Sequence, residues 1–323
     1  MSAWQLQAQF SEQNLLQRQQ ELRQFWRSGH HQHFAAKDGT QLACSQFIQP
    51  NARADLVISP GRIEAAEKYM ESCFDLYKAG FNLHLPDHRG QGRSARLCAD
   101  PHLGYVADFD DYVQDLELFI QSKVRPLVRG PLLALGHSMG SAILCRYLQS
   151  TAQHGIQGAV FCSPMFGLPM ASLPEPVALW LCKALRWWQG TPQYFPGQKP
   201  YRPVPFADNH LCQSQGRYQW FRDLYQQQPE LQLGGVSSHW LVQALLACRQ
   251  IQQAPPLRLP QLVLQAGADD VVANPAQNLY VARQPGARLL RIDRAKHELF
   301  LETDSIRAEL YQQLQLFWQQ LGI

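Results

Sequence analysis

The chain has 323 residues, of which 46% are hydrophobic and 17% charged, a composition that is typical of a folded enzyme and excludes a disordered or fibrous protein. Its formal net charge of +3 is too small to indicate a partner nucleic acid. No apolar run approaches the length of about 18 residues that spans a membrane, and the first residues lack a signal-peptide pattern, so we expect a cytoplasmic protein.

The eight cysteines are scattered along the chain, without a close pair or a Cys-x-x-Cys motif. Several of them lie in apolar runs. This pattern favours buried, reduced thiols over disulfides and over a metal site. We therefore expect neither a metal nor another cofactor.

The first segment, residues 1–30, is predicted to form an N-terminal helix over residues 4 to 27. Trp4, Leu6, Phe10 and Leu22 stand there among Gln, Glu and Arg, which makes the helix mildly amphipathic. Two interpretations stay open. The helix either packs on the rest of the protein or contacts the surface of a membrane.

Residues 31–165 alternate between predicted strands and helices. Strands are expected on both sides of an Asp38-Gly39 hairpin turn, and then at residues 54–59, 81–85, 131–135 and 158–162. Helices are expected at residues 65–78, 109–124 and 141–148. This alternation predicts an α/β protein with a mostly parallel central sheet and helices on both faces.

The alternation is interrupted over residues 166–254, which we interpret as an inserted helical cap. Two helical stretches, 177–188 and 238–248, are joined by a Pro-rich passage with no clear period. Residues 166–250 hold five of the eight tryptophans, and seven basic against four acidic residues. The alternation resumes in residues 255–323, with strands at 261–265 and 287–292 and helices at 275–282 and 305–321.

The most specific motif is Gly136-His137-Ser138-Met139-Gly140, which lies between a predicted strand and a predicted helix. Gly-x-Ser-x-Gly in that context is a nucleophile elbow, in which a sharp turn exposes the serine hydroxyl above the sheet. The flanking glycines are needed because the strained turn leaves no room for larger side chains. Ser138 is the predicted nucleophile.

A serine nucleophile needs a histidine base that is oriented by a carboxylate, and in this fold class the chain order is Ser, Asp, His. Asp269 follows the strand at 261–265, and His297 follows the strand at 287–292. We predict that they complete the triad, with Asp270 as the alternative acid. His137 is interpreted as a packing residue and His88 as a residue that orders its loop.

An ester-cleaving site also needs two backbone N–H donors for the oxyanion. Met139, directly after the nucleophile, is the first predicted donor. Arg62, in the turn after the strand at 54–59, is the second, and Gly61 allows the backbone to approach closely. The Arg62 side chain is interpreted either as a contact for an anionic head group or as a solvated arginine.

The elbow, the loop at residues 87–94 and the Asp269 and His297 segments resemble the monoacylglycerol lipase and lysophospholipase branch of the α/β-hydrolases. Within this branch, residues 60–64, 296–298 and 233–240 resemble the bacterial PldB-type lysophospholipases. Pro60 departs from the more general branch, where a histidine commonly precedes the glycine. The resemblance implies an α/β-hydrolase fold, an acyl-enzyme on Ser138, and substrate contacts at Gly61, His239 and Trp240.

We therefore expect a serine hydrolase that cleaves carboxylic esters of single-chain lipids, foremost a lysophospholipase. Monoacylglycerol lipase or general carboxylesterase activity is the alternative. A proline aminopeptidase or thioesterase would share the triad, and a non-catalytic scaffold would lack one member of it. The partners expected are a lipid-like substrate, no nucleic acid, and a possible peripheral contact with the anionic inner face of the cytoplasmic membrane.

Overall fold

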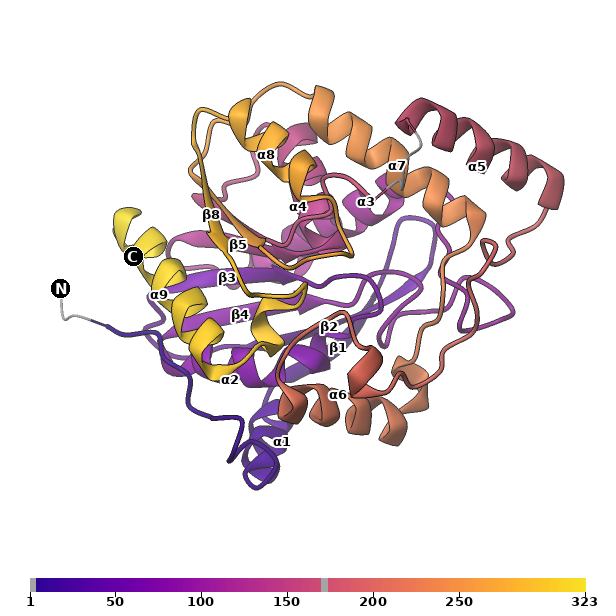
Figure 1. Cartoon of the computed structure of the whole chain (residues 1–323). Helices are drawn as coiled ribbons and strands as arrows, with labels where there is room; N and C mark the ends of the chain where they lie inside the picture. Colours follow the sequence, from indigo (N-terminus) through magenta and orange to yellow (C-terminus); the bar gives the residue numbers. More distant parts are fainter. Residues whose placement is uncertain (1–3, 170–173) are drawn as a thin grey trace.

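The computed structural model describes residues 4–169 and 174–323. In these residues eight strands form one sheet, in the order β1-β2-β4-β3-β5-β6-β7-β8 (Figure 1). The pairs β1·β2 and β2·β4 are antiparallel, and every other pair is parallel. The strands are His30–Ala35 (β1), Gln41–Phe47 (β2), Ala54–Ser59 (β3), Phe81–Pro86 (β4), Leu132–His137 (β5), Gly158–Cys162 (β6), Gln261–Ala266 (β7) and Ala287–Ile292 (β8).

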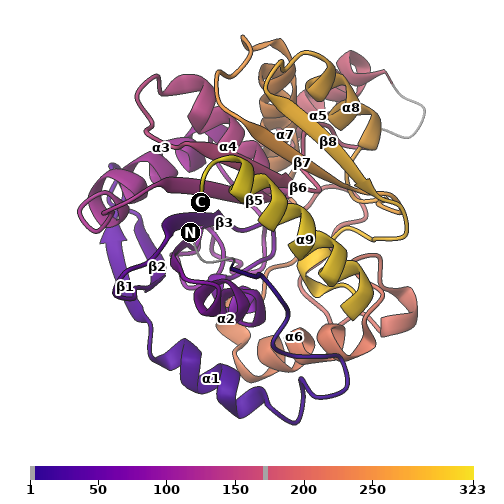
Figure 2. The same ribbon diagram turned by 90° about the vertical axis from the view of Figure 1, so that its left-hand side faces the viewer.

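Helices cover both faces of this sheet, so the predicted fold class is confirmed (Figure 2). On one face lie α2 and α9, and on the other α3, α4, α7 and α8. The α-helices are Gln19–Arg27 (α1), Met70–Lys78 (α2), Phe109–Phe119 (α3), Met139–Ser150 (α4), Glu175–Gln189 (α5), Gln215–Gln227 (α6), Ser238–Gln253 (α7), Asn274–Ala282 (α8) and Asp304–Gln320 (α9). Short 3-10 turns are Ala66–Tyr69 (η1), Phe206–Asp208 (η3), Pro229–Leu231 (η4) and Leu299–Leu301 (η5), and a π-helical turn, Ile120–Val124 (η2), continues α3.

The two apolar layers follow from the period of two in the strands. Leu133 and Leu135 of β5 pack into the layer with α2 and α9, whereas Leu132 and Ala134 pack into the layer with α3 and α4. A strand that is buried on both faces has an almost continuous run of apolar residues. The ends of such a run predict the bounds of the strand.

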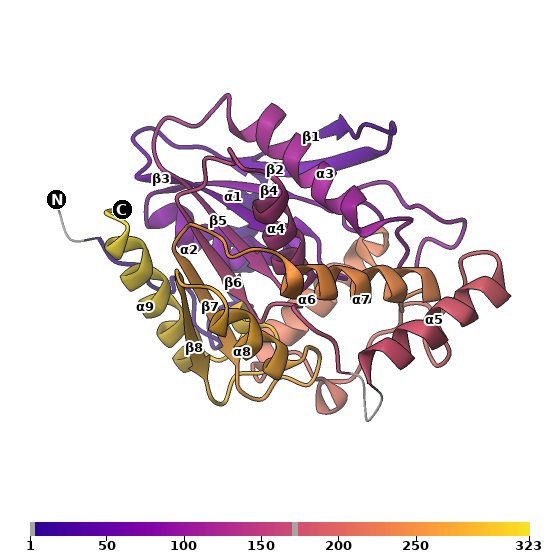
Figure 3. The ribbon, with the colours of Figure 1, turned by 90° about the horizontal axis from the view of Figure 1, so that it is seen from above.

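The segment between β6 and β7 lies in two places rather than forming one helical unit. Helix α7 packs on α4 and carries α5 on its outer side (Figure 3). Helix α6 lies on the opposite face of the sheet, in a passage where the sequence shows no clear helical period. There the buried Arg217 Nε lies 2.9 Å from Oε2 of Glu71 in α2. A buried ion pair of this kind fixes α6 to the core.

The predicted helix over residues 4 to 27 is too long. Only Gln19–Arg27 forms a regular helix. Residues 12–18 form hydrogen-bonded turns, and residues 4–10 have no regular secondary structure. Two backbone N–H groups of residues 4–10 have partners in other elements: that of Leu6 donates to Gln315, and that of Gln9 donates to Asp75. These hydrogen bonds and the buried Phe10 side chain hold the segment against the core. The interpretation that the segment packs on the rest of the protein is therefore favoured over a membrane contact. In the part of the chain that the structure describes, no helix combines the length and apolarity needed to cross a membrane.

Candidate active site

The turn between β5 and α4 has the geometry of a nucleophile elbow. Ser138 adopts φ 52° and ψ −118°, in the left-handed region that side chains other than glycine rarely occupy. A Cβ at Gly140 would overlap the carbonyl oxygens of Ser59 and Pro60, and a Cβ at Gly136 would overlap the backbone of Ser141. Both glycines are therefore required by close approach of the backbone.

Ser138, His297 and Asp269 form a continuous hydrogen-bonded chain. His297 Nε2 lies 2.9 Å from Ser138 Oγ, and His297 Nδ1 lies 2.8 Å from Asp269 Oδ2. The Asp269 side chain is fully buried, and that of His297 is 5% exposed. With Nδ1 donating to the carboxylate, Nε2 accepts the serine proton, which is the arrangement that activates a hydroxyl for attack on a carbonyl.

Asp269 and His297 meet because β7 and β8 are neighbours in the sheet. After these strands the two loops stay paired: the Gly267 N–H donates to the Ile292 carbonyl, and the Ala268 N–H donates to the Ala295 carbonyl. The second carboxylate oxygen of Asp269 accepts the Val271 N–H at 2.9 Å, which fixes its orientation.

Asp270, the alternative acid, does not join this chain. Its Oδ2 lies 2.6 Å from Nδ1 of His210, and both side chains are more than half exposed. The two adjacent aspartates therefore have separate environments, one at the site and one on the surface.

The two expected oxyanion donors lie on the two loops that flank Ser138. Met139 is the first residue of α4, so its N–H has no helical acceptor and lies at the positive end of the helix dipole. Within the described residues, no hydrogen bond from the Arg62 N–H is found. The N–H of Gly61, by contrast, donates to Glu64 Oε2 at 2.5 Å and is therefore occupied.

A buried charge network below the elbow was not predicted from the sequence. His137 Nδ1 lies 3.0 Å from Glu64 Oε2, and His137 Nε2 lies 3.1 Å from the backbone carbonyl of His297. Lys68 Nζ bridges Glu64 Oε1 at 3.1 Å and Glu298 Oε1 at 2.6 Å. The sequence predicts a packing role for His137. In the structure it connects the loop after β3 that carries Arg62 and Glu64 (the oxyanion loop) to the loop after β8 that carries His297 (the histidine loop).

The ionisation of this network follows from its partners. Burial by itself would raise the pKa of Glu64, but the charges of His137 and Lys68 outweigh it and hold that pKa well below its usual value. Burial opposes the charge of His137, and the neighbouring Glu64 more than compensates and raises the pKa of that imidazole. A charged Glu64–His137 pair therefore holds the loops around the site.

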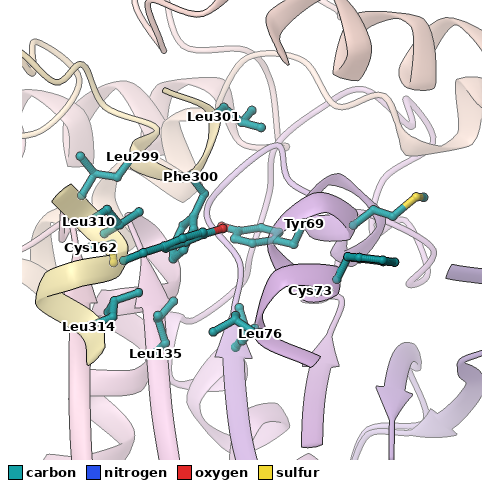
Figure 4. Packing of buried hydrophobic residues seen from close by; sticks show 14 of the residues in the cluster. Tyr69, Cys73, Leu76, Leu135, Cys162, Leu299, Phe300, Leu301, Leu310 and Leu314 are labelled. Carbon is teal, nitrogen blue, oxygen red and sulfur yellow. The ribbon is translucent and has the colours of Figure 1, made fainter. Parts of the chain in front are cut away.

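The turn after His297 rests on the apolar core. Leu299, Phe300 and Leu301 of η5 face a cluster that includes Tyr69 and Cys162 (Figure 4). The Glu298 N–H donates to the carbonyl of Leu211 at 2.8 Å, so the segment before α6 also holds the histidine loop. No local sequence pattern signals these contacts, because their partners are far apart in the chain.

His88 orders its loop, as its position suggested. Its Nε2 lies 3.0 Å from the Ser59 hydroxyl, at the end of β3. Burial lowers the pKa of His88 to about 4, so this imidazole is neutral at physiological pH.

The expected substrate contacts in the cap are mostly buried. Trp240 is 5% exposed, and the Arg62 guanidinium lies over its ring at 5.4 Å. His239 is 8% exposed and packs beside the ring of Tyr105. Arg62 is not simply solvated: its Nη1 donates to the Gly234 carbonyl at 2.9 Å, so it joins the oxyanion loop to the segment before α7.

A pocket of about 290 Å³ opens beside the site, between the oxyanion loop and the segments around α6. It adjoins the reacting groups through Arg62 and through Glu298, the residue directly after His297. Its ionisable lining, apart from tyrosines, comprises Arg62, Lys68, Lys199, Arg202, Arg222 and Glu298. We call it the basic pocket.

The chain is similar to known proteins over most of its length. The family model described as "Hydrolase_4: Serine aminopeptidase, S33" matches residues 50–304. Lysophospholipase L2 of Escherichia coli (strain K12) is 36% identical over 300 residues, 89% of this chain and 86% of that protein. The probable lysophospholipase L2 of Haemophilus influenzae is 30% identical over 290 residues, 88% of this chain and 91% of that protein.

Among solved structures, a soluble variant of monoglyceride lipase from Saccharomyces cerevisiae has a TM-score of 0.69 at 17% identity, covering 91% of this chain and 95% of that one. At this identity the likeness concerns the fold. The match of the family model over residues 50–304 identifies the protein as a member of the Hydrolase_4 (S33) family, and the structural likeness agrees with the α/β-hydrolase fold.

Proposed function

We propose that this protein is a serine hydrolase that releases the fatty acid from a lysophospholipid, with monoacylglycerol as the second substrate class. The observation that carries the reaction type is the hydrogen-bonded chain from Ser138 through His297 to Asp269. The similarity to lysophospholipase L2 over 89% of the chain supports a single-chain lipid as the substrate.

In the proposed mechanism, Ser138 Oγ attacks the ester carbonyl while its proton passes to His297 Nε2. The oxyanion accepts hydrogen bonds from the N–H groups of Met139 and Arg62. His297 then donates its proton to the leaving glycerol oxygen, and an acyl-enzyme on Ser138 remains. A water molecule gives a proton to His297 and attacks this acyl group; the ester bond to Ser138 Oγ breaks, the proton passes from His297 to Ser138 Oγ, and the fatty acid leaves.

The segment 166–254 acts as the cap in this proposal, between core parts 31–165 and 255–323, with residues 1–30 as the N-terminal segment. The acyl chain gains about 0.8 kcal/mol for each buried CH₂ group. Gly61, His239 and Trp240 remain the proposed substrate contacts. For Trp240 the contact would be indirect, through the Arg62 guanidinium that lies over its ring.

The basic pocket favours an ester with an anionic group over an aminopeptidase substrate. An aminopeptidase holds the ammonium group of its substrate with carboxylates, because buried charges need opposite charges. Beside the site, five cationic side chains meet a single carboxylate, Glu298, which already pairs with Lys68. This charge balance disfavours a substrate that carries an amine.

We further propose that α5, rather than residues 4–27, makes a peripheral contact with the inner face of the cytoplasmic membrane. Trp180, Trp187 and Trp188 are 67%, 86% and 78% exposed on this helix, which also carries Lys183 and Arg186. Exposed tryptophans beside basic residues suit the interface of an anionic bilayer. The aromatic residues of the N-terminal segment instead pack against the core.

A substrate panel tests this function. The kcat/KM values of the purified protein are measured for a long-chain lysophospholipid, a monoacylglycerol of equal chain length and a short nitrophenyl ester. We expect the long-chain lipids to be preferred, because remote binding energy can be used at the reacting centre. A clear preference for the short ester would refute the lipid assignment.

A further inference from the structure

The basic pocket holds more positive charge than its neighbours neutralise. Lys68 is paired with both Glu64 and Glu298, so it contributes no net excess. The other cations of the pocket are Arg62, Lys199, Arg202 and Arg222. In the described part of the chain, no ion pair with a carboxylate is found for any of these four. The pocket is therefore electrostatically suited to an anion.

Arg222, on α6, is the most restrained of these cations. Its Nη2 donates to the Tyr218 hydroxyl at 2.7 Å, and its guanidinium lies over the ring of Phe221 at 4.7 Å. Burial opposes its charge, but hydrogen bonds to Tyr201 and Tyr218 outweigh it and raise the pKa of the guanidinium. Its buried Nε has no acceptor among the residues described. Because no carboxylate of residues 4–169 or 174–323 pairs with this guanidinium, an anion in the pocket would be attracted to its charge.

Arg62 supplies a second positioned cation at the end of the pocket nearest the reaction. Its backbone lies in the proposed oxyanion loop, and its side chain is held by the Gly234 carbonyl and the Trp240 ring. Burial lowers the pKa of this guanidinium to about 10, so it still carries its charge at neutral pH. Lys199 and Arg202, which also line the pocket, are exposed, and the Lys199 carbonyl accepts the N–H of Gly235, beside the Gly234 that holds Arg62.

We propose that the basic pocket is a phosphate subsite, which binds the phosphate of the substrate's head group while the ester lies at Ser138. This inference rests on the proposed function, and it deepens it: the enzyme prefers acidic glycerophospholipids with one acyl chain over neutral monoacylglycerols. The phosphate has several oxygens and can accept hydrogen bonds from the guanidinium groups of both Arg62 and Arg222. These planar, charged donors bind a phosphate better than they bind a neutral glycerol. Arg62, whose backbone lies in the proposed oxyanion loop, also lines the pocket, so the proposed phosphate and ester positions share this residue.

Two substitutions test the subsite through selectivity. Arg222→Gln removes the restrained cation, and Arg202→Gln removes an exposed one. Arg249→Gln, on the exposed surface of α7 and outside the pocket, is the control with the same loss of charge. The measured quantity is the kcat/KM for lysophosphatidylglycerol divided by that for the monoacylglycerol of equal chain length.

We expect this ratio to fall about tenfold or more in Arg222→Gln, as for loss of a charge-assisted hydrogen bond, and less in Arg202→Gln. Arg249→Gln should keep the ratio of the wild type. A ratio that stays unchanged in both pocket variants, or that falls equally in the control, would overturn the subsite.

A binding measurement separates the subsite from the activity. In Ser138→Ala, the melting temperature is followed with sn-glycerol 3-phosphate, inorganic phosphate and glycerol at constant ionic strength. We expect stabilisation by glycerol 3-phosphate that Arg222→Gln weakens, and none by glycerol. Equal stabilisation by inorganic phosphate would define the phosphate alone as the ligand, and no response to either anion would refute the subsite. If lipid hydrolysis fails while this response persists, the proposed function is wrong and the subsite stands.

Discussion

Ser138 adopts a backbone conformation that costs about 1–3 kcal/mol and that the surrounding structure maintains. The positions of the nucleophile elbow and of the triad residues were largely predictable from the sequence. Gly-x-Ser-x-Gly after an apolar strand specifies the elbow, and the order Ser, Asp, His along the chain specifies the order of the loops. The Glu64–His137 pair was not predictable, because its members are far apart in sequence and no motif joins them.

The choice between the two adjacent aspartates is open to direct test. Asp269→Asn should lower kcat about 10⁴-fold, because an amide leaves the His297 imidazole in the wrong tautomer. Asp270→Asn, on the surface beside His210, should retain nearly full activity. Steady-state kinetics on one ester substrate checks both variants, and the reverse ranking would assign the role to Asp270.

His88 should make the protein sensitive to acid. Its pKa is lowered to about 4 in the folded state, whereas an unfolded chain takes up the proton below about pH 6.5. Between these values the unfolded state binds more protons, so stability falls as the pH falls, by on the order of 3 kcal/mol. Below about pH 4, His88 is protonated in both the folded and the unfolded state, so it causes no further loss of stability.

Denaturant unfolding at pH 4.5 and pH 7 measures the effect. His88→Asn should lose less stability between these two pH values than the wild type loses. His33→Asn, at an exposed residue of β1, should lose as much stability between the two pH values as the wild type loses. Equal acid losses in all three proteins would contradict the account of His88.

At the scale of elements, the sheet was predictable and parts of the helical periphery were not. Buried parallel strands are continuous apolar runs, so β3 and β6 were predicted with the bounds that the structure has. The segment before α1 carries apolar residues at intervals that also suit a helix. Its long-range hydrogen bonds to α2 and α9 stabilise a different conformation. The local sequence does not indicate these bonds, because their partners are far away in the chain.

The packing of this N-terminal segment predicts a difference between adjacent leucines. Leu15 is fully buried and Leu16 is 40% exposed. Leu15→Ala should lower the free energy of unfolding by about 2–5 kcal/mol, the cost of a cavity in a packed core, whereas Leu16→Ala should change it by less than about 1 kcal/mol. Denaturant unfolding compares the two. Similar small effects would indicate that the segment is not part of the core.

Helix α5 should carry the proposed membrane contact. Replacing Trp187 and Trp188 together by Ser should weaken cosedimentation with anionic vesicles at low salt, because it removes the exposed aromatic surface. Ser replacement of the exposed Leu279 on α8 is the control for loss of an apolar side chain elsewhere. Vesicle binding that is unaffected by the α5 variant would place the contact on another surface or exclude it.

At the scale of the whole molecule, the sheet order brings together groups from four distant segments. The loops after β3, β5, β7 and β8 carry Arg62, Ser138, Asp269 and His297, and they meet because these loops leave the same edge of the parallel strands. The segment between β6 and β7 then adds α6 and α7 around this edge. The sequence indicated such an insertion by its lost alternation, but not its division between both faces of the sheet.

In the proposed function, Ser138 is the nucleophile that releases fatty acid from a single-chain phospholipid. The most direct measurement is fatty acid release from a long-chain lysophospholipid by the wild type and by Ser138→Ala, with the fold of both checked by circular dichroism. We expect release by the wild type and a loss of at least about 10³-fold in the variant, which keeps only binding and oxyanion effects. A folded Ser138→Ala variant that retains more than a few per cent of the wild-type rate would contradict the claim.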